Sequence, residues 1–292
     1  MYDPLTCLRS SCPLVDKEGR IIAVLGGRPN DPSYLGLTQE AARHLETART
    51  DIKFKPEQID GRRGSFFSLS YGISYGGGQQ VPGNLRHSAA TCLIMEALFK
   101  LECFYRIAGF ANGLFKAWNP AVHALYTLTL DALIYDDNPS LKRNFLQHFS
   151  AFAAATLNFG PSTVTFPHID ALNLAWGWCA ITALGNFDPD TGGHLVLWDL
   201  KLIIRFPAGS TILIPSAILR HSNVPISTTE SRYSFTQFTA AGLFRWVANG
   251  FKSDITVDAE IRTDTEAQTQ RAHAQRHRWA EGIDSYKRWT TV

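Results

Sequence analysis

The chain of 292 residues is 45% hydrophobic, so it can bury a sizeable core as one domain, 1–292. Its five cysteines form no CxxC pair, which argues against a disulfide framework and against a cysteine-built zinc site. The net charge of +2 permits a nucleic-acid partner without requiring one, and since no apolar run reaches the ~18 residues of a membrane span, we expect an intracellular monomer with no membrane contact and no disulfide-linked partner.

The N-terminal part, 1–85, is expected to flank the catalytic core. Two short apolar runs around a DKEG turn predict a hairpin over 12–30, and a short helix is expected over 32–49. A basic stretch follows, and it leads into the glycine-rich loop YGISYGGGQQVPGN. The basic side chains of this stretch are Lys53, Lys55, Arg62 and Arg63.

The next region, 86–155, is rich in Ala, Leu and Phe at helical spacing. Breaks near Asn119-Pro120 and Asn138-Pro139 divide it into three expected helices. These helices should support the second half of the chain.

The texture changes to short β-rich segments over 156–250, including WCAITALG, HLVLWD, STILIPS and RYSFTQFT, separated by turns such as DPDTGG. Helices followed by many short strands predict an α+β fold with a helical layer braced against a β-sandwich or jelly roll. The extension 251–292 should be helical, and it places Arg271 and Arg278 on one face, which suits either phosphate contacts or a solvated helix.

A metal site is indicated by TVTFPHID, in which His168 and Asp170 would project from the same face of a strand. A third ligand, His221, follows 51 positions after Asp170. Two His and one carboxylate leave coordination positions open, as in non-haem Fe(II) sites, whereas a closed zinc site would need a fourth protein ligand. The alternative is a hydrogen-bonded His–Asp pair at a strand end.

A carboxylate site is indicated by Arg232 and Ser234, which occupy successive same-face positions in SRYSFTQFT. A guanidinium can pair with a carboxylate through two hydrogen bonds, and the serine hydroxyl adds a donor. The alternative is a surface strand arginine, but the phenylalanines beside it favour a buried position.

Together, HxD, the distant His and R-x-S resemble the Fe(II)/2-oxoglutarate-dependent dioxygenases. The resemblance covers about the last 130 residues and includes DTGGHLVLWD and FPAGSTILIPS. It implies a double-stranded β-helix over 156–250, Fe(II) on His168, Asp170 and His221, and 2-oxoglutarate on Arg232 and Ser234, with O₂ as the oxidant. HIDALN is most similar to the TET/JBP branch, whose members carry Asn or Asp at the position of Asn173, and the whole chain looks like the fungal members found in mushroom genomes.

The TET/JBP resemblance implies a nuclear enzyme that flips a methylated DNA base into its pocket and oxidises the methyl group. We expect 5-methylcytosine, with N6-methyladenine as the alternative base, and substrate contacts from Asn173, Gln79, Gln80 and Asn84. Ala240 stands where TET-like enzymes usually carry a base-contacting His, and the cysteine-rich region of the animal enzymes is absent from this sequence. The other candidate functions are a 2-oxoglutarate hydroxylase of a protein or small molecule, and an inactive jelly-roll binding protein.

Overall fold

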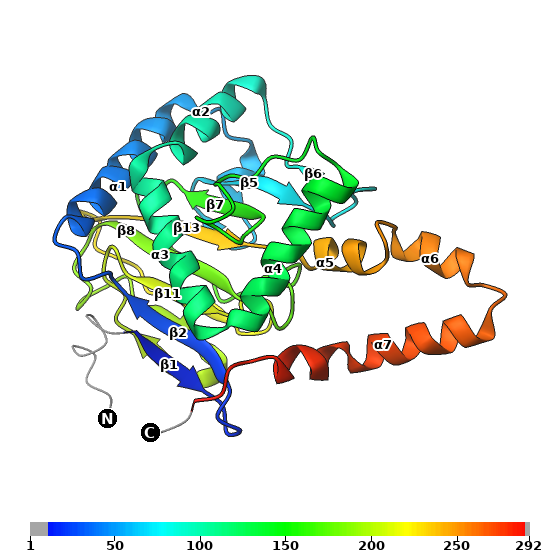
Figure 1. The fold of residues 1–292 in the computed structure, drawn as a ribbon. Helices are drawn as coiled ribbons and strands as arrows, with labels where there is room; N and C mark the ends of the chain where they lie inside the picture. The colour runs from blue at the N-terminus through cyan, green and yellow to red at the C-terminus, as the bar shows by residue number, and fades with distance from the viewer. Residues whose placement is uncertain (1–10, 290–292) are drawn as a thin grey trace.

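The computed structural model describes residues 11–289, which form two β-sheets with helices on one side (Figure 1). The main sheet has eight strands in the order β1-β2-β11-β8-β13-β7-β5-β6. In chain order these are β1 (Cys12–Val15), β2 (Ile21–Gly27), β5 (Ser68–Ser74), β6 (Gly83–Asn84), β7 (Ala154–Asn158), β8 (Cys179–Asn186), β11 (Thr211–Ile214) and β13 (Ser231–Phe238). All of their pairings are antiparallel.

The smaller sheet has three strands in the order β10-β9-β12. They are β9 (Leu195–Leu197), β10 (Leu202–Ile204) and β12 (His221–Asn223), with the 3-10 turn η4 (Trp198–Leu200) between the first two. A separate two-residue hairpin, β3 (Asp60–Gly61) and β4 (Gly64–Ser65), follows the turn η2 (Pro56–Gln58).

The helices on the outer face of the main sheet come from the N-terminal half (Figure 1). They are α1 (Tyr34–Asp51), α2 (Ala89–Phe99), α3 (Glu102–Trp118) and α4 (Pro120–Ala132), which continues as the π-helical turn η3 (Leu133–Asp137). α5 (Ala241–Ala248) packs against the body beside α4, and the two helices that follow it, α6 (Asp254–Glu260) and α7 (Thr265–Asp284), form an arm that projects from the body (Figure 1).

The two faces of β13 explain how the sheet separates its core from its site. Tyr233 and Phe235 point outward into the cluster formed with α1 and α3, while Arg232 and Ser234 alternate with them and belong to the inner face. The inner face of β8 packs on the smaller sheet, where Ala183 shares a cluster with Leu195. The interior between the sheets is therefore apolar along β8, whereas β13, β7 and β5 place polar side chains on the inner face, among them Ser234, Asn158 and Ser68.

The predicted α+β fold class with a jelly-roll core is confirmed, but its main sheet recruits more of the chain than 156–250. The predicted hairpin over 12–30 is β1–β2 and joins the sheet through β11, while β5 pairs with β7. β5 lies in the part that was expected to be a basic and glycine-rich loop region. The helices expected over 32–49 and 86–155 are α1 and α2–α4.

The segment carrying His168 and Asp170 is not a regular strand, contrary to the sequence prediction. Residues 162–170 form no strand and make two isolated bridges, Ser162 with Arg232 and His168 with His221. Pro161 and Pro167 lack backbone N–H groups, so this segment cannot form a continuous ladder. Single bridges hold it instead.

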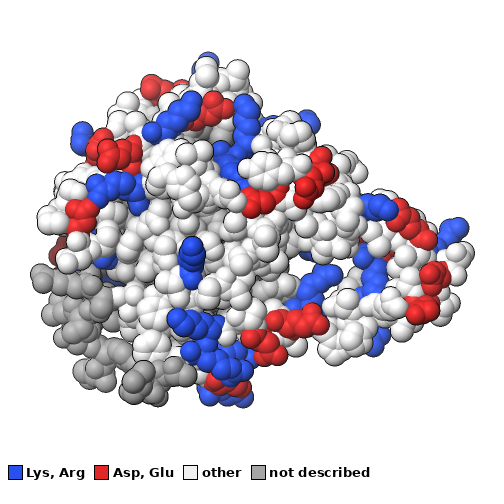
Figure 2. Space-filling view, viewed as in Figure 1, with Lys and Arg blue, Asp and Glu red and all other residues white. Residues whose placement is uncertain are grey.

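The arm is stabilised by charge pairs, and this corrects the phosphate role considered for Arg271. Its guanidinium bonds the side chains of Asn249 (3.1 Å), Asp254 (2.9 Å) and Asp258 (2.6 Å), so it is committed within the arm. Figure 2 shows acidic and basic side chains interspersed along this part of the surface. No helix within 11–289 combines the length and apolar character needed to cross a membrane.

The helix-facing core gives a first prediction, for Phe104. Its ring is fully buried and meets Phe99 and Phe235 edge-on. We expect Phe104→Ala to lower the free energy of unfolding by about 3–5 kcal/mol, as measured by urea denaturation, because the cavity cannot fully collapse. Leu93→Ala on the exposed side of α2 is the control and should change it by less than about 0.5 kcal/mol; an equal loss in both variants would contradict this account of the core.

Candidate active site

Three side chains converge where the smaller sheet meets the 163–170 segment. The ligand atoms of His168, Asp170 and His221 all lie within 4.8 Å of one another, and no other such group of His, Cys, Asp or Glu side chains occurs among residues 11–289. The His168 Nε2 to Asp170 Oδ1 distance is 3.8 Å. Both His side chains are buried and Asp170 is half-buried.

Backbone carbonyl oxygens bind the ring nitrogens of the two His residues that face away from the shared space. The Nδ1–H of His168 donates to Phe166 O (2.7 Å), and the Nδ1–H of His221 donates to Leu219 O (2.9 Å). The two residues also exchange backbone hydrogen bonds, and the amide of Asp170 donates to Ser216 O (2.8 Å). Each imidazole therefore presents Nε2 to the shared space in a fixed tautomer.

The environment keeps the first imidazole neutral. Burial, followed by the neighbouring His221, holds the pKa of His168 below its ordinary value. A neutral Nε2 has a lone pair available for a metal ion. Two imidazoles and one carboxylate are the donor set expected for non-haem Fe(II), so the residues fit that ion.

Arg232 is a buried cation that pairs with no carboxylate among residues 11–289. Only 1% of it is exposed, and burial lowers its pKa to about 10, so it remains charged at neutral pH. Its Nη1 donates to Thr163 O (2.9 Å). It also bonds Asn223, whose side-chain amide is oriented so that its nitrogen donates to Thr165 Oγ1 and its oxygen accepts from Arg232 Nη1 (3.1 Å) and Nη2 (2.6 Å). Nε is left without a hydrogen-bond partner, which fits an anion that the protein itself does not supply.

Ser234 lies beside Arg232 on the same face of β13, as the sequence predicted. The amide of Asn158 on β7 donates to its Oγ (2.7 Å), so the Ser234 hydroxyl proton can be donated to another acceptor. The Asn158 Oδ1 is itself buried and unpaired. The Arg232 Nε–H and the Ser234 hydroxyl are thus two donors on the same strand face that are available to a carboxylate.

Of the expected substrate residues, Asn173 lies nearest to the metal ligands. Its backbone N–H donates to Asp170 O (2.9 Å), and its side-chain amide donates to Ser216 Oγ (3.1 Å). It also forms a β-bridge with Ala240, so the two positions compared with TET-like enzymes are direct neighbours. The Asn173 amide oxygen accepts no hydrogen bond from residues 11–289.

The other expected substrate residues lie elsewhere. Asn84 donates to Ser140 O (3.1 Å) and accepts from Lys142 N (3.0 Å), so its amide ties β6 to the loop after η3. Gln79 and Gln80 are in the loop between β5 and β6. None of the three lines the pocket beside the metal ligands.

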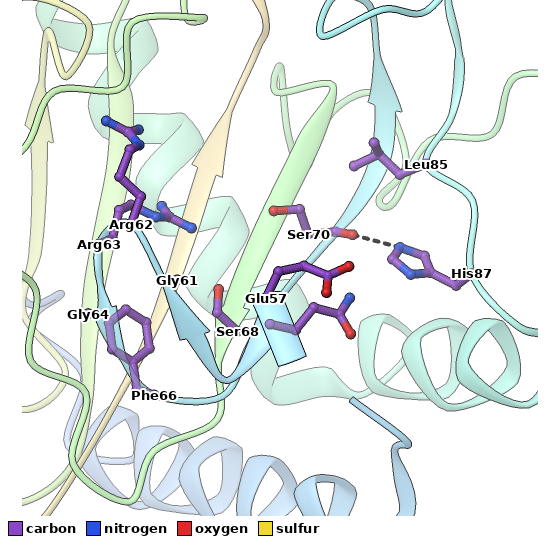
Figure 3. A pocket seen from close by; sticks show the side chains of 11 residues that line it. Glu57, Gly61, Arg62, Arg63, Gly64, Phe66, Ser68, Ser70, Leu85 and His87 are labelled. Carbon is purple, nitrogen blue, oxygen red and sulfur yellow. Dashed lines mark hydrogen bonds between the residues drawn. The ribbon is translucent and has the colours of Figure 1, made fainter. Parts of the chain in front are cut away.

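That pocket, of about 320 Å³, lies between the β3–β4 hairpin and β5 (Figure 3). Arg63 lines it and also approaches the metal ligands, with Nη1 3.9 Å from Asp170 Oδ1. Sequence reasoning placed Arg63 only in a basic stretch, and it missed Asn158 and Asn223 altogether. A lone Asn in a β-rich run carries no local signal, because its role depends on cross-strand register.

Comparison with known proteins supports the fold. No protein-family model matches the chain, and no curated protein does. Among solved structures, NgTET1 in complex with 5mC DNA matches with a TM-score of 0.54 and 15% identity, covering 79% of this chain and 76% of that one. Two further solved structures match with a TM-score of 0.35 and 14% identity each. One is a 2OG-Fe(II) oxygenase family oxidoreductase from Burkholderia pseudomallei, for which the match covers 68% of this chain and 76% of that one. The other is a Pseudomonas putida prolyl-4-hydroxylase, for which it covers 71% of this chain and 88% of that one. The predicted resemblance to a TET-like 2-oxoglutarate oxygenase is confirmed at the level of the fold.

Proposed function

We propose that this protein is an Fe(II)- and 2-oxoglutarate-dependent dioxygenase. The carrying observation is the convergence of His168, Asp170 and His221, with both Nδ1 atoms held by the backbone and both Nε2 atoms available. Such a triad leaves open positions on one face of the metal for a cosubstrate and O₂. Its intact state also argues against an inactive jelly roll.

The cosubstrate site supports the same reaction class. Arg232 would pair with the distal carboxylate of 2-oxoglutarate through donors that include its unpaired Nε, and Ser234 would donate its hydroxyl. Asn158 holds the Ser234 oxygen in place for that contact. When bound, Fe(II) with 2-oxoglutarate and O₂ supplies the oxidising power for attack on a C–H bond, while the chain supplies position and a water-poor pocket.

The substrate we propose is a methylated base in DNA, with 5-methylcytosine favoured and N6-methyladenine the alternative. This proposal is supported by the fold match to a protein solved with 5mC DNA and by the basic segment that ends in Arg62 and Arg63 beside the site. Chemistry on a base methyl requires the nucleotide to leave its stack. The free amide oxygen of Asn173 is placed to accept a hydrogen bond at the mouth of the site.

The test is mass spectrometry of nucleosides after methylated DNA is incubated with the protein, Fe(II) and 2-oxoglutarate. We expect oxidised 5-methylcytosine to appear only when both are present, because neither alone completes the site. His221→Ala serves as the control and should give no product. If the nucleosides are unchanged but the protein consumes 2-oxoglutarate when a peptide or small molecule is supplied as substrate, the DNA substrate is wrong and the hydroxylase alternative is supported.

A further inference from the structure

The pocket between the β3–β4 hairpin and the inner face of β5 has a polar, built lining (Figure 3). We refer to it as the hairpin pocket. The side chains or backbone of eleven residues line it: Glu57, Gln58, Gly61, Arg62, Arg63, Gly64, Phe66, Ser68, Ser70, Leu85 and His87. Its volume of about 320 Å³ is within the range of small-ligand sites.

The hairpin is docked directly on the segment that carries the metal ligands. The backbone N–H of Phe166 donates to Arg63 O (2.8 Å). Gly64 has φ +144°, and a Cβ there would lie 2.4 Å from Val164 O, so only glycine permits this approach. The Arg63 guanidinium, which lines the pocket, lies 3.9 Å from Asp170 Oδ1 and so connects the hairpin with the metal-ligand segment.

The floor of the pocket is continuous with the cosubstrate site. Register pairs Ser234 with Asn158 and Asn158 with Ser68, so one row of side chains crosses β13, β7 and β5 on the same face. Ser68 lines the hairpin pocket, and Ser234 flanks Arg232. Two residues of the pocket lining thus connect it with the site: Ser68 lies two strands from Ser234 on the same face of the sheet, and the Arg63 side chain approaches Asp170.

His87 offers a fixed acceptor to this pocket. Its Nε2–H donates to Ser70 O (2.8 Å; Figure 3). Its ring also stacks on Tyr71, with ring centroids 5.8 Å apart and ring planes at 21°. Burial lowers its pKa from the ordinary value, so the ring is neutral at pH 7. Nδ1 is then an acceptor in a fixed orientation.

The edge of the hairpin pocket carries hydrogen-bonding and charged groups in addition to the His87 acceptor. Glu57 is an exposed carboxylate, an acceptor only, and Arg62 is an exposed cation. Gln58 Oε1 accepts from Lys55 N (2.8 Å), which leaves its NH₂ group as a donor. Phe66 contributes an apolar surface.

We infer that the hairpin pocket binds a nucleobase that carries an exocyclic amine, with Glu57 accepting from the amine and Arg62 contacting the adjoining phosphate; this inference rests on the proposed function. Carboxylates accept from the cytosine N4 amine, and guanidiniums bind phosphate. Thymine has the same methyl group as 5-methylcytosine but a carbonyl in place of the amine, so Glu57 would meet an acceptor and repel it. The pocket is thus a specificity site.

The experiment compares single-stranded oligonucleotides that carry one central 5-methylcytosine or one thymine. Binding to protein loaded with Mn(II) and 2-oxoglutarate is followed by fluorescence anisotropy. Wild type should bind the 5-methylcytosine strand about tenfold more tightly, a difference of about 1.4 kcal/mol. Glu57→Gln should lose this preference, and Ser68→Leu or His87→Phe should weaken binding about tenfold by filling the pocket or removing its acceptor.

Glu46→Gln, an exposed acid on α1 outside the pocket, is the matched control and should behave as wild type. Equal wild-type affinity for the two strands, or unchanged binding by Glu57→Gln, His87→Phe and Ser68→Leu together, would overturn the inference. Turnover with Fe(II) separates it from the proposed function. If the pocket variants oxidise the base at the wild-type rate, the inference about the pocket is wrong and the proposed function stands. If binding depends on the pocket but no base is oxidised, the inference about the pocket stands and the proposed reaction is wrong.

Discussion

Alanine at any one of His168, Asp170 and His221 is expected to abolish metal binding and all turnover. Among residues 11–289 these three side chains are the only group that could hold a metal ion, and each residue is already held in position by backbone contacts, so no neighbouring group is expected to replace a missing one. Loss of an outer partner of a metal site costs about 10–100-fold in affinity, and loss of a ligand should exceed that range. Titration calorimetry with Mn(II) measures the affinity without requiring activity.

Asp51→Ala, at the exposed end of α1, is the control for removal of a carboxylate outside the site. It should bind Mn(II) as wild type does. Unchanged melting temperatures in the triad variants would show that the fold persists without a ligand. Wild-type metal affinity in all three variants would contradict the assignment and would return His168 and Asp170 to the role of a hydrogen-bonded pair.

The second large effect is expected from Arg232→Ala, which should weaken 2-oxoglutarate binding by at least about tenfold. A charge-assisted hydrogen bond contributes about 1.5–3 kcal/mol, and the substitution leaves the cosubstrate carboxylate unpaired in a buried place. Binding of 2-oxoglutarate to the Mn(II)-loaded protein is the measurement. Ser234→Ala removes one donor only and should have a smaller effect.

Arg232→Lys separates charge from geometry in the same experiment. An ammonium keeps the positive charge but cannot reproduce the two-point contact, so affinity should recover only in part. Arg232 also bonds Thr163 O and Asn223, so the melting temperature must be followed beside binding. Unaltered 2-oxoglutarate affinity in a folded Arg232→Ala protein would leave this arginine a structural role alone.

The catalytic half of the fold could be predicted because its signals are local. Alternating side chains in SRYSFTQFT predict a strand with two different faces, and β13 has Phe235 outside and Ser234 inside. β5 could not be predicted in the same way. Its sequence, SLSYGIS, is rich in Ser and contains Gly, and its place in the sheet comes from pairing with β7, 86 residues away at Ser70 and Thr156.

The candidate site also contains residues that sequence spacing predicts and residues that only the folded structure brings there. Two His, one Asp and one Arg at characteristic separations predict a metal and its cosubstrate; the side chains of the two His and the Asp lie together, and Arg232 is buried as predicted. The predicted strand geometry was wrong, since single bridges and not a ladder hold His168. Arg63 and Asn158 reach the site through hairpin docking and strand register, which no sequence spacing encodes.

The most direct test of the account is the fate of oxygen from ¹⁸O₂. The protein is incubated with Fe(II), 2-oxoglutarate and a methylated oligonucleotide, and the masses of succinate and of the oxidised base are measured by mass spectrometry. A dioxygenase of this class places one oxygen atom in succinate and one in the oxidised base, so we expect both to gain labelled oxygen in equal amounts, and neither to do so with Asp170→Ala. Unlabelled succinate, or an oxidised base labelled only from water, would contradict the central claim.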